Sequence, residues 1–151
     1  MDLTISVKDS ILNVRVVILA HTKNGYLFEK NPDGYLYFVG GRIKINETSE
    51  EAAKREFFEE TGIKVDKVNF KTTLENFFVF ENEKKFHEIC FFYEVPDELK
   101  INVKEFKLVE CPISEFAKTD IRPKIMKDYI LSNDNKPHVI YKDYTKTRNL
   151  L

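Results

Sequence analysis

The chain has 151 residues, a length that favours one domain, and its 24 basic and 25 acidic residues leave a net charge of −1. This balance argues against the strongly basic surface that binds long nucleic acid. Cys90 and Cys111 lack metal-ligand spacing, and charged residues interrupt the mildly apolar N-terminus at positions 8, 9 and 15, which fits neither a signal peptide nor a membrane span. The protein is therefore expected to be cytoplasmic, with no membrane partner.

Apolar runs and turn signals predict β-structure in the first part of the chain. Strands are expected at about 12–20 and 26–30, joined by a turn at Asn24-Gly25, a dipeptide typical of tight hairpins. A second turn at 31–34 precedes a short strand that begins at Tyr35 and leads into Gly40-Gly41. These glycines permit backbone conformations closed to other residues and let a carbonyl group approach a ligand.

A helix is predicted from about Thr48 to Thr61. Thr48 followed three residues later by Glu51 forms a capping box, the pattern that satisfies unpaired amides at a helix start. Gly62 supplies the stop. Ala53 and Phe57, four residues apart, give the helix an apolar edge that can dock on a sheet.

The second half of the chain predicts a hairpin and a terminal helix. Two β-rich runs at about 65–80 and 85–95 flank the polar residues 81–84, and apolar residues recur at helical spacing over 122–131. The final stretch, 138–151, is either an additional strand with a frayed tail or a dimer contact. Together, these predicted strands and helices indicate a mixed β-sheet flanked by helices.

Glu56, Glu59 and Glu60 fall on one face of the predicted helix, at positions i, i+3 and i+4. Like charges at this spacing weaken a helix by a few tenths of a kcal/mol per pair, so the cluster calls for a cation. Oxygen ligands without cysteine or histidine suit Mg²⁺, Mn²⁺ or Ca²⁺. The alternative is a solvated acidic helix face.

The segment GRIKINETSEEAAKREFFEETGI at 41–63 resembles the Nudix box, G-x5-E-x7-R-E-U-x-E-E-x-G-U, where U is a bulky aliphatic or aromatic residue. It fits at every fixed position: Gly41, Glu47, Arg55, Glu56, Phe57, Glu59, Glu60, Gly62 and Ile63. The stretch YLYFVGG at 35–41 is similar to the family's segment before the box, with Val39 where proline is common. EFKLVECPISEF at 105–116 and DIRP at 120–123 resemble its closing strand, turn and final helix.

The resemblance implies the fold, the cofactor and the residue roles. It implies an α/β (α+β) fold, a Nudix-type α/β/α sandwich with a mixed β-sheet, forming a single hydrolase domain over 1–151. Catalysis is assigned to Glu56, Glu59, Glu60 and Arg55, and Mg²⁺ or Mn²⁺ to the three glutamates with the Gly40 carbonyl. Glu56 is either a ligand of the metal ion or the general base, and the sequence does not separate these two roles. Arg55 and Glu47 brace the site, because an arginine can fork onto carboxylates, and Gly41, Glu47 and Gly62 are structural.

Two further candidates lie outside the box. Glu88 is the candidate for an additional metal ligand, with Glu75 and Glu83 as competitors and a solvated strand face as the alternative. Strand alternation places Glu88 on one face with Cys90, Phe92 and Glu94. The aromatic residues Tyr37 and Phe78 are candidates to stack on a base, although aromatic residues at strand spacing are more often core.

The resemblance implies a metal-dependent pyrophosphohydrolase, in which water attacks a diphosphate bond of a nucleoside diphosphate linked to another moiety. Counting from Ile63 reaches Val79 and Phe80, so the proline of ADP-ribose enzymes and the tyrosine of diadenosine polyphosphate enzymes are absent. Elimination favours a nucleoside triphosphate, including a damaged one. Alternatives are a dinucleoside polyphosphate, nucleotide-sugar or ADP-ribose hydrolase, a catalytically silent nucleotide sensor, and a prenyl diphosphate isomerase. The partner is a small nucleotide, and the protein is a monomer or homodimer.

Overall fold

The computed structural model describes residues 1–80 and 82–146. Its strands are β1 (Thr4–Val7), β2 (Ser10–Leu19), β3 (His21–Thr22), β4 (Gly25–Lys30), β5 (Leu36–Arg42), β6 (Asn69–Val79), β7 (Lys85–Glu94), β8 (Leu108–Cys111), β9 (Ile121–Arg122) and β10 (His138–Lys146). Its helices are α1 (Ser49–Thr61) and α2 (Lys124–Ser132), with short 3-10 helices at Val103–Phe106 and Ile113–Lys118.

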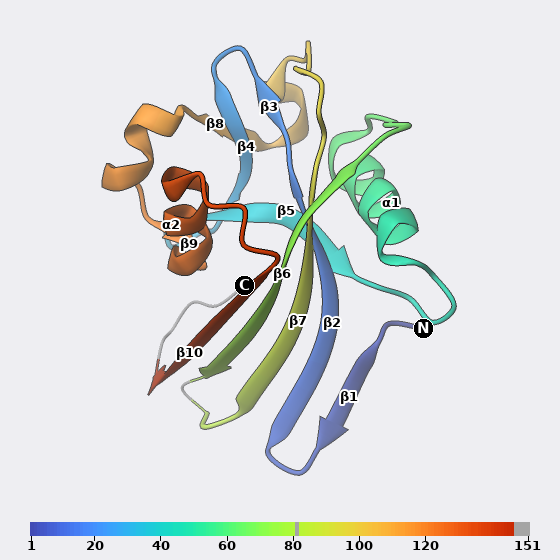
Figure 1. Cartoon of the computed structure of the whole chain (residues 1–151), viewed down its shortest axis with the longest axis vertical. Helices are drawn as coiled ribbons and strands as arrows, with labels where there is room; N and C mark the ends of the chain where they lie inside the picture. Colours follow the sequence, from blue (N-terminus) through green and yellow to red (C-terminus); the bar gives the residue numbers. More distant parts are fainter. Residues whose placement is uncertain (81, 147–151) are drawn as a thin grey trace.

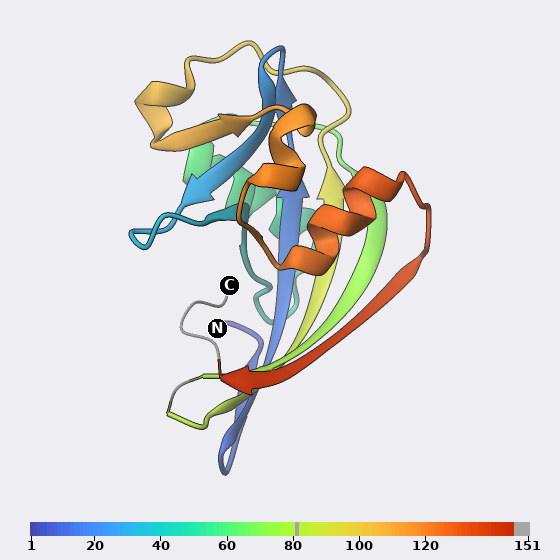
Figure 2. The ribbon, with the colours of Figure 1, turned by 90° about the vertical axis from the view of Figure 1, so that its left-hand side faces the viewer.

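All these strands belong to one mixed sheet, with the order β10-β6-β7-β2-β5-β4-β3. Strand β1 pairs with β2, β8 with β4, and β9 with β5. The β2–β7, β10–β6 and β5–β9 pairs are parallel, and the remaining pairs are antiparallel. Helices α1 and α2 lie on opposite sides of this sheet (Figures 1 and 2). The predicted α/β/α sandwich with a mixed sheet is therefore confirmed.

Strand β2 contributes to two hydrophobic cores, one on each face of the sheet. Val16 and Ile18 pack with Phe57 of α1, whereas Val17 and Leu19 pack with Met126 of α2. This division follows from the period of two along a strand. A strand with apolar residues on both faces must be covered on both, which explains the continuous apolar run VVILA at 16–20 in the sequence.

The observed elements differ from the predicted ones mainly at their ends. Helix α2 begins at Lys124, after Pro123, because a proline disfavours helical geometry in the residue before it. Strand β1 was not predicted, because its turn to β2 contains no glycine and instead places Lys8 at a φ of 52°. The predicted additional strand is β10, beside β6. Residues 147–151 of that stretch lie outside the described residues.

No helix among the described residues is long and apolar enough to span a membrane.

Candidate active site

Helix α1 begins and ends where the sequence predicts. The Thr48 hydroxyl accepts the Glu51 backbone N–H at 3.2 Å, and the Glu51 carboxylate accepts the Thr48 N–H at 2.8 Å, which completes the capping box. At the other end, Gly62 adopts the left-handed conformation with φ 70° and donates its N–H to the Phe58 carbonyl at 2.7 Å. These local bonds fix the register of the helix and therefore the direction of every carboxylate on it.

The buried face of α1 consists of Ala52, Ala53, Phe57 and Thr61. Phe57 has no exposed surface and anchors the helix in the core beside β2 and β5. Glu56 flanks this face, with a side chain 12% exposed, whereas Glu59 is 49% exposed. The docking of Phe57 thus directs Glu56 inward towards the strand that carries the double glycine.

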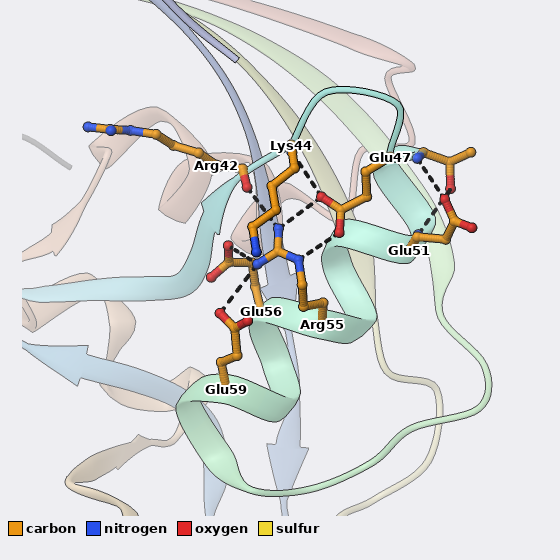
Figure 3. Close-up of polar contacts among 8 residues, drawn as sticks. Arg42, Lys44, Glu47, Glu51, Arg55, Glu56 and Glu59 are labelled. Carbon is orange, nitrogen blue, oxygen red and sulfur yellow. Dashed lines mark hydrogen bonds and ion pairs between the residues drawn. The ribbon is translucent and has the colours of Figure 1, made fainter. Parts of the chain in front are cut away.

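Arg55 holds three of the acidic side chains together (Figure 3). Its Nε and one terminal nitrogen donate to the two oxygens of Glu47 at 2.6 and 2.9 Å. The other terminal nitrogen donates to Glu56 at 2.6 Å and to Glu59 at 3.3 Å. Hydrogen bonding by the guanidinium lowers the pKa of Glu47, and the carboxylates in turn raise the pKa of Arg55. This geometry supports the predicted bracing role of Arg55 and Glu47.

The double glycine lies close to Glu56. A Cβ atom on Gly41 would come within 2.2 Å of the Glu56 carboxyl carbon, and one on Gly40 within 2.2 Å of the Val16 carbonyl oxygen. Both glycines are therefore required by close approach rather than by a positive φ. Both glycines lie within strand β5, where Gly40 and Gly41 pair with Val17 and Val16 of β2, and the space beside Gly41 is occupied by the Glu56 carboxylate.

The structure adds a carboxyl group that the sequence pattern does not predict. Glu29 of β4 lies opposite Tyr37 of β5 in the sheet register, and its carboxyl group contacts that of Glu60. Burial, followed by the hydrogen bond and the charge of Glu60, raises the pKa of Glu29 to about 8. The available signal was a charged residue in the apolar strand YLFEK, but periodicity cannot say which element faces it.

Glu88 does not join the box glutamates. It is 1% exposed, and its Oε1 lies 3.6 Å from a terminal nitrogen of Arg15 and 3.5 Å from the side-chain nitrogen of Asn13. Burial raises the pKa of Glu88, and Arg15 partly offsets this effect. The polar neighbours of Glu88 are those of a buried ion pair on the sheet, and its role as a metal ligand stays a prediction. Of its competitors, Glu75 pairs with His138 at 2.8 Å.

The two aromatic candidates have different surroundings. Phe78 is 1% exposed and stacks on Phe86 with ring centroids 5.0 Å apart, so it offers no free face to a base. Phe78 is thus a core residue in this structure, and its role in substrate binding stays a prediction. Tyr37 is partly exposed, and Glu29 and Glu60 both lie close enough to raise the pKa of its hydroxyl, after the larger effect of burial. Tyr37 thus stays a candidate beside the acidic cluster.

The donor set suits an oxygen-preferring divalent ion, because it contains carboxylates and the Gly40 carbonyl but no thiol or imidazole. The fit is supported by the Glu56 carboxylate seated against Gly41. Among the residues that the structure describes, however, no three acidic, histidine or cysteine side chains converge closely enough to hold an ion. Arg55 instead holds Glu56 and Glu59. Ion binding therefore requires rotation of these glutamates.

A family model for the NUDIX domain matches residues 11–129. The fold is similar to that of the MutT protein from Bacillus halodurans, with a TM-score of 0.64 and 20% identity over 86% of this chain and 90% of that one. MutT from Methanosarcina mazei Go1 gives a TM-score of 0.58 and 19% identity, covering 87% and 99% of the two chains. A NUDIX hydrolase from Nitrosomonas europaea gives a TM-score of 0.55 and 18% identity, covering 87% of this chain and 79% of that one. No curated protein sequence matches the chain.

The fold and the family model define a hydrolase of phosphoric anhydride bonds. The chain belongs to the Nudix family, whose members act on nucleoside diphosphate-linked substrates. The resemblance seen in the sequence is therefore confirmed.

Proposed function

We propose that this protein is a divalent-metal-dependent pyrophosphohydrolase whose substrate is a nucleoside triphosphate, including a damaged one. The observation that carries the proposal is the Glu56 carboxylate, which is held by Arg55 at 2.6 Å and seated against Gly41. A carboxylate placed beside the double glycine of β5 is an oxygen ligand of the kind that binds the divalent ion used in phosphoryl transfer. We also propose that residues 1–151 act as a single domain. The cytoplasmic location stays a prediction.

The proposed roles follow from the contacts. A bound Mg²⁺ or Mn²⁺ would neutralise the diphosphate and lower the pKa of the attacking water. Glu56, Glu59, Glu60 and the Gly40 carbonyl are the groups that would hold it. Arg55 binds Oε1 of Glu56 and leaves Oε2 without a hydrogen-bond partner among the described residues. This second oxygen is available to bind the ion or to take a proton from water, so the ligand and base roles of Glu56 both stay open.

The rival isomerase function needs a reactive cysteine. Both cysteines are buried, and burial strongly raises the pKa of the Cys90 thiol, with the Glu88 charge adding to the effect. Because the thiolate is the reactive form, Cys90 is poorly suited to this chemistry. The proposal of a hydrolase is therefore preferred over this alternative.

A substrate screen tests the proposal. The purified protein is incubated with Mg²⁺ or Mn²⁺ and nucleoside triphosphates, dinucleoside polyphosphates, nucleotide sugars or ADP-ribose, and the phosphate-containing products are identified. We expect a triphosphate to yield a monophosphate and pyrophosphate. Glu60→Gln should lose at least 99% of turnover, on the order of the loss expected for an electrostatic catalytic group. Glu50→Gln is the matched control, because Glu50 is an exposed glutamate in the first turn of the same helix.

The outcomes separate the remaining functions. If only ADP-ribose, a nucleotide sugar or a dinucleoside polyphosphate is hydrolysed, the proposed substrate is wrong, but the proposed hydrolysis of a diphosphate bond stands. Nucleotide binding without product formation would identify a silent sensor. Normal turnover in Glu60→Gln would overturn the assignment of the site.

A further inference from the structure

Residues 1–3 lie beside the loop that joins β5 to α1 (Figure 1). Leu3 donates its N–H to the Ile43 carbonyl at 2.8 Å. Asp2 forms an antiparallel bridge with Lys44, the next residue of the loop. Residues 1–3, here called the N-terminal segment, therefore pair with the start of this loop through their backbone.

The N-terminal segment is itself fixed to the sheet and to the core. The Leu3 carbonyl accepts the Val14 N–H of β2 at 3.0 Å, and the Ile43 N–H donates to the Val14 carbonyl at 3.0 Å. Ile43 is buried in the core that contains Phe57, and Leu3 packs against the same core. The loop is thus held between β2 on one side and the N-terminal segment on the other.

The loop residues held in this way begin the turn that carries Glu47. The Ile45 N–H donates to the Met1 carbonyl at 2.8 Å, which fixes the second residue of this turn. The Lys44 carbonyl accepts the Glu47 N–H at 3.1 Å, and the Lys44 N–H donates to the Glu47 carboxylate at 2.9 Å. A shift of the loop would therefore move the carboxylate that orients Arg55.

Arg55 connects this loop to the glutamates of α1 (Figure 3). Its guanidinium also donates to the Arg42 carbonyl at 3.0 Å, to Glu56 at 2.6 Å and to Glu59 at 3.3 Å. The guanidinium is planar and its donors have fixed directions, so the loop groups that orient it also set the positions of the carboxylates that it holds. The ion pair of Asp2 with Arg42, at 3.6 Å, joins two exposed side chains and contributes little. The backbone bonds of the N-terminal segment are therefore the contacts that matter for this arrangement.

We propose that the N-terminal segment is a positioning element of the active site, which holds the loop so that Arg55 keeps Glu56 in place for catalysis. This inference rests on the proposed function, because it assumes that Glu56 acts in the hydrolysis. Residues 1–3 lie before the region matched by the family model, residues 11–129, so the family pattern does not predict their contact with the loop.

Replacement of Leu3 by proline tests this role, because proline lacks the N–H that binds the Ile43 carbonyl. Turnover is measured with Mg²⁺ and the nucleoside triphosphate that the natural protein hydrolyses fastest. We expect Leu3→Pro to lower kcat roughly tenfold or more, because small misplacements of reacting groups have large effects. KM should stay within about twofold, because the change removes no group proposed to bind the nucleotide. Leu3→Ala keeps the N–H, so its loss should be smaller.

Ile5→Ala is the control, because Ile5 is exposed on β1 and pairs with β2 rather than with the loop. It should have the kcat of the natural protein. If the N-terminal segment only stabilises the fold, Leu3→Pro lowers the melting temperature but keeps its kcat in assays well below that temperature. That result would overturn the inference.

Proton exchange at Arg55 gives a second measurement, on the protein without metal or nucleotide. The Arg55 Nε–H is bonded to Glu47 at 2.6 Å, so it should exchange slowly with water in an NMR experiment. Leu3→Pro should speed this exchange roughly tenfold or more, whereas Ile5→Ala should not change it. An unchanged exchange rate in Leu3→Pro would overturn the positioning role, whatever the turnover.

The two measurements also separate this inference from the proposed function. If the natural protein hydrolyses none of the substrates, the proposed function fails, whereas the exchange rate at Arg55 still tests the contact between segment and loop. If circular dichroism shows that Leu3→Pro does not fold, deletion of residues 2 and 3 replaces it. This deletion withdraws the Met1 carbonyl from Ile45, and the same results are expected or count against the role.

Discussion

Removal of the Arg55 guanidinium should destabilise the protein, because this group holds three acidic side chains. Arg55→Ala leaves Glu47, Glu56 and Glu59 without the cation to which they are bonded at 2.6 to 3.3 Å. Breaking a buried ion pair from one side costs about 3–5 kcal/mol, and a hydrogen bond to a charged group contributes about 1.5–3 kcal/mol. The Arg55 side chain is 21% exposed, and solvent screening therefore places the loss at roughly 2–4 kcal/mol.

Thermal unfolding followed by circular dichroism measures this loss. For a chain of this length, each kcal/mol corresponds to about 2–4 °C, so Arg55→Ala should lower the melting temperature by roughly 5–15 °C. Arg55→Lys should recover only part of it, because an ammonium group cannot form the two-pronged contact with Glu47. Adding Glu47→Gln to Arg55→Ala should restore part of the stability by removing one unpaired carboxylate. A melting temperature for Arg55→Ala within 2 °C of the natural value would refute this reasoning.

Further predictions concern the two glycines Gly41 and Gly62 and the stability of the protein at acidic pH. Gly41→Ala should fold but displace the Glu56 carboxylate, with a roughly hundredfold loss of turnover, because small misplacements of reacting groups have effects of this order. Gly62→Ala, at φ 70°, should instead lose about 1–2 kcal/mol of stability and keep most of its turnover, and the opposite pattern would contradict both roles. The lowered pKa of Glu47 stabilises the protein above the ordinary value of 4.5, and this contribution is lost as the pH falls through the pKa in the folded state. In urea titrations, the difference in unfolding free energy between the natural protein and Glu47→Gln should therefore shrink below about pH 4.5. A difference that stays constant with pH would show that pairing of the Glu47 carboxylate with Arg55 is not the source of this stability.

The sequence predicted the elements whose signals are local. The capping box at Thr48 and the stop at Gly62 act within four residues of their partners, so the helix and the face shared by its glutamates follow from spacing alone. The hairpin at Asn24-Gly25 is likewise local. Alternation also placed Glu88 and Cys90 correctly on one face, where both are buried.

What lies against each face was decided only by the tertiary structure. Glu88 and Asn13 are 75 residues apart in the sequence and meet because β2 and β7 pair in parallel, a register that neither strand encodes by itself. Glu29 meets Glu60 because α1 packs against β5, the strand that pairs with β4. Phe78 is buried and stacks on Phe86 of the neighbouring strand β7. Strand periodicity determines which side chains share a face, but burial, charge pairing and ligand geometry depend on the element packed over that face. The sequence thus determined the helix with its row of glutamates, whereas strand register and layer packing decided which other residues stand beside it.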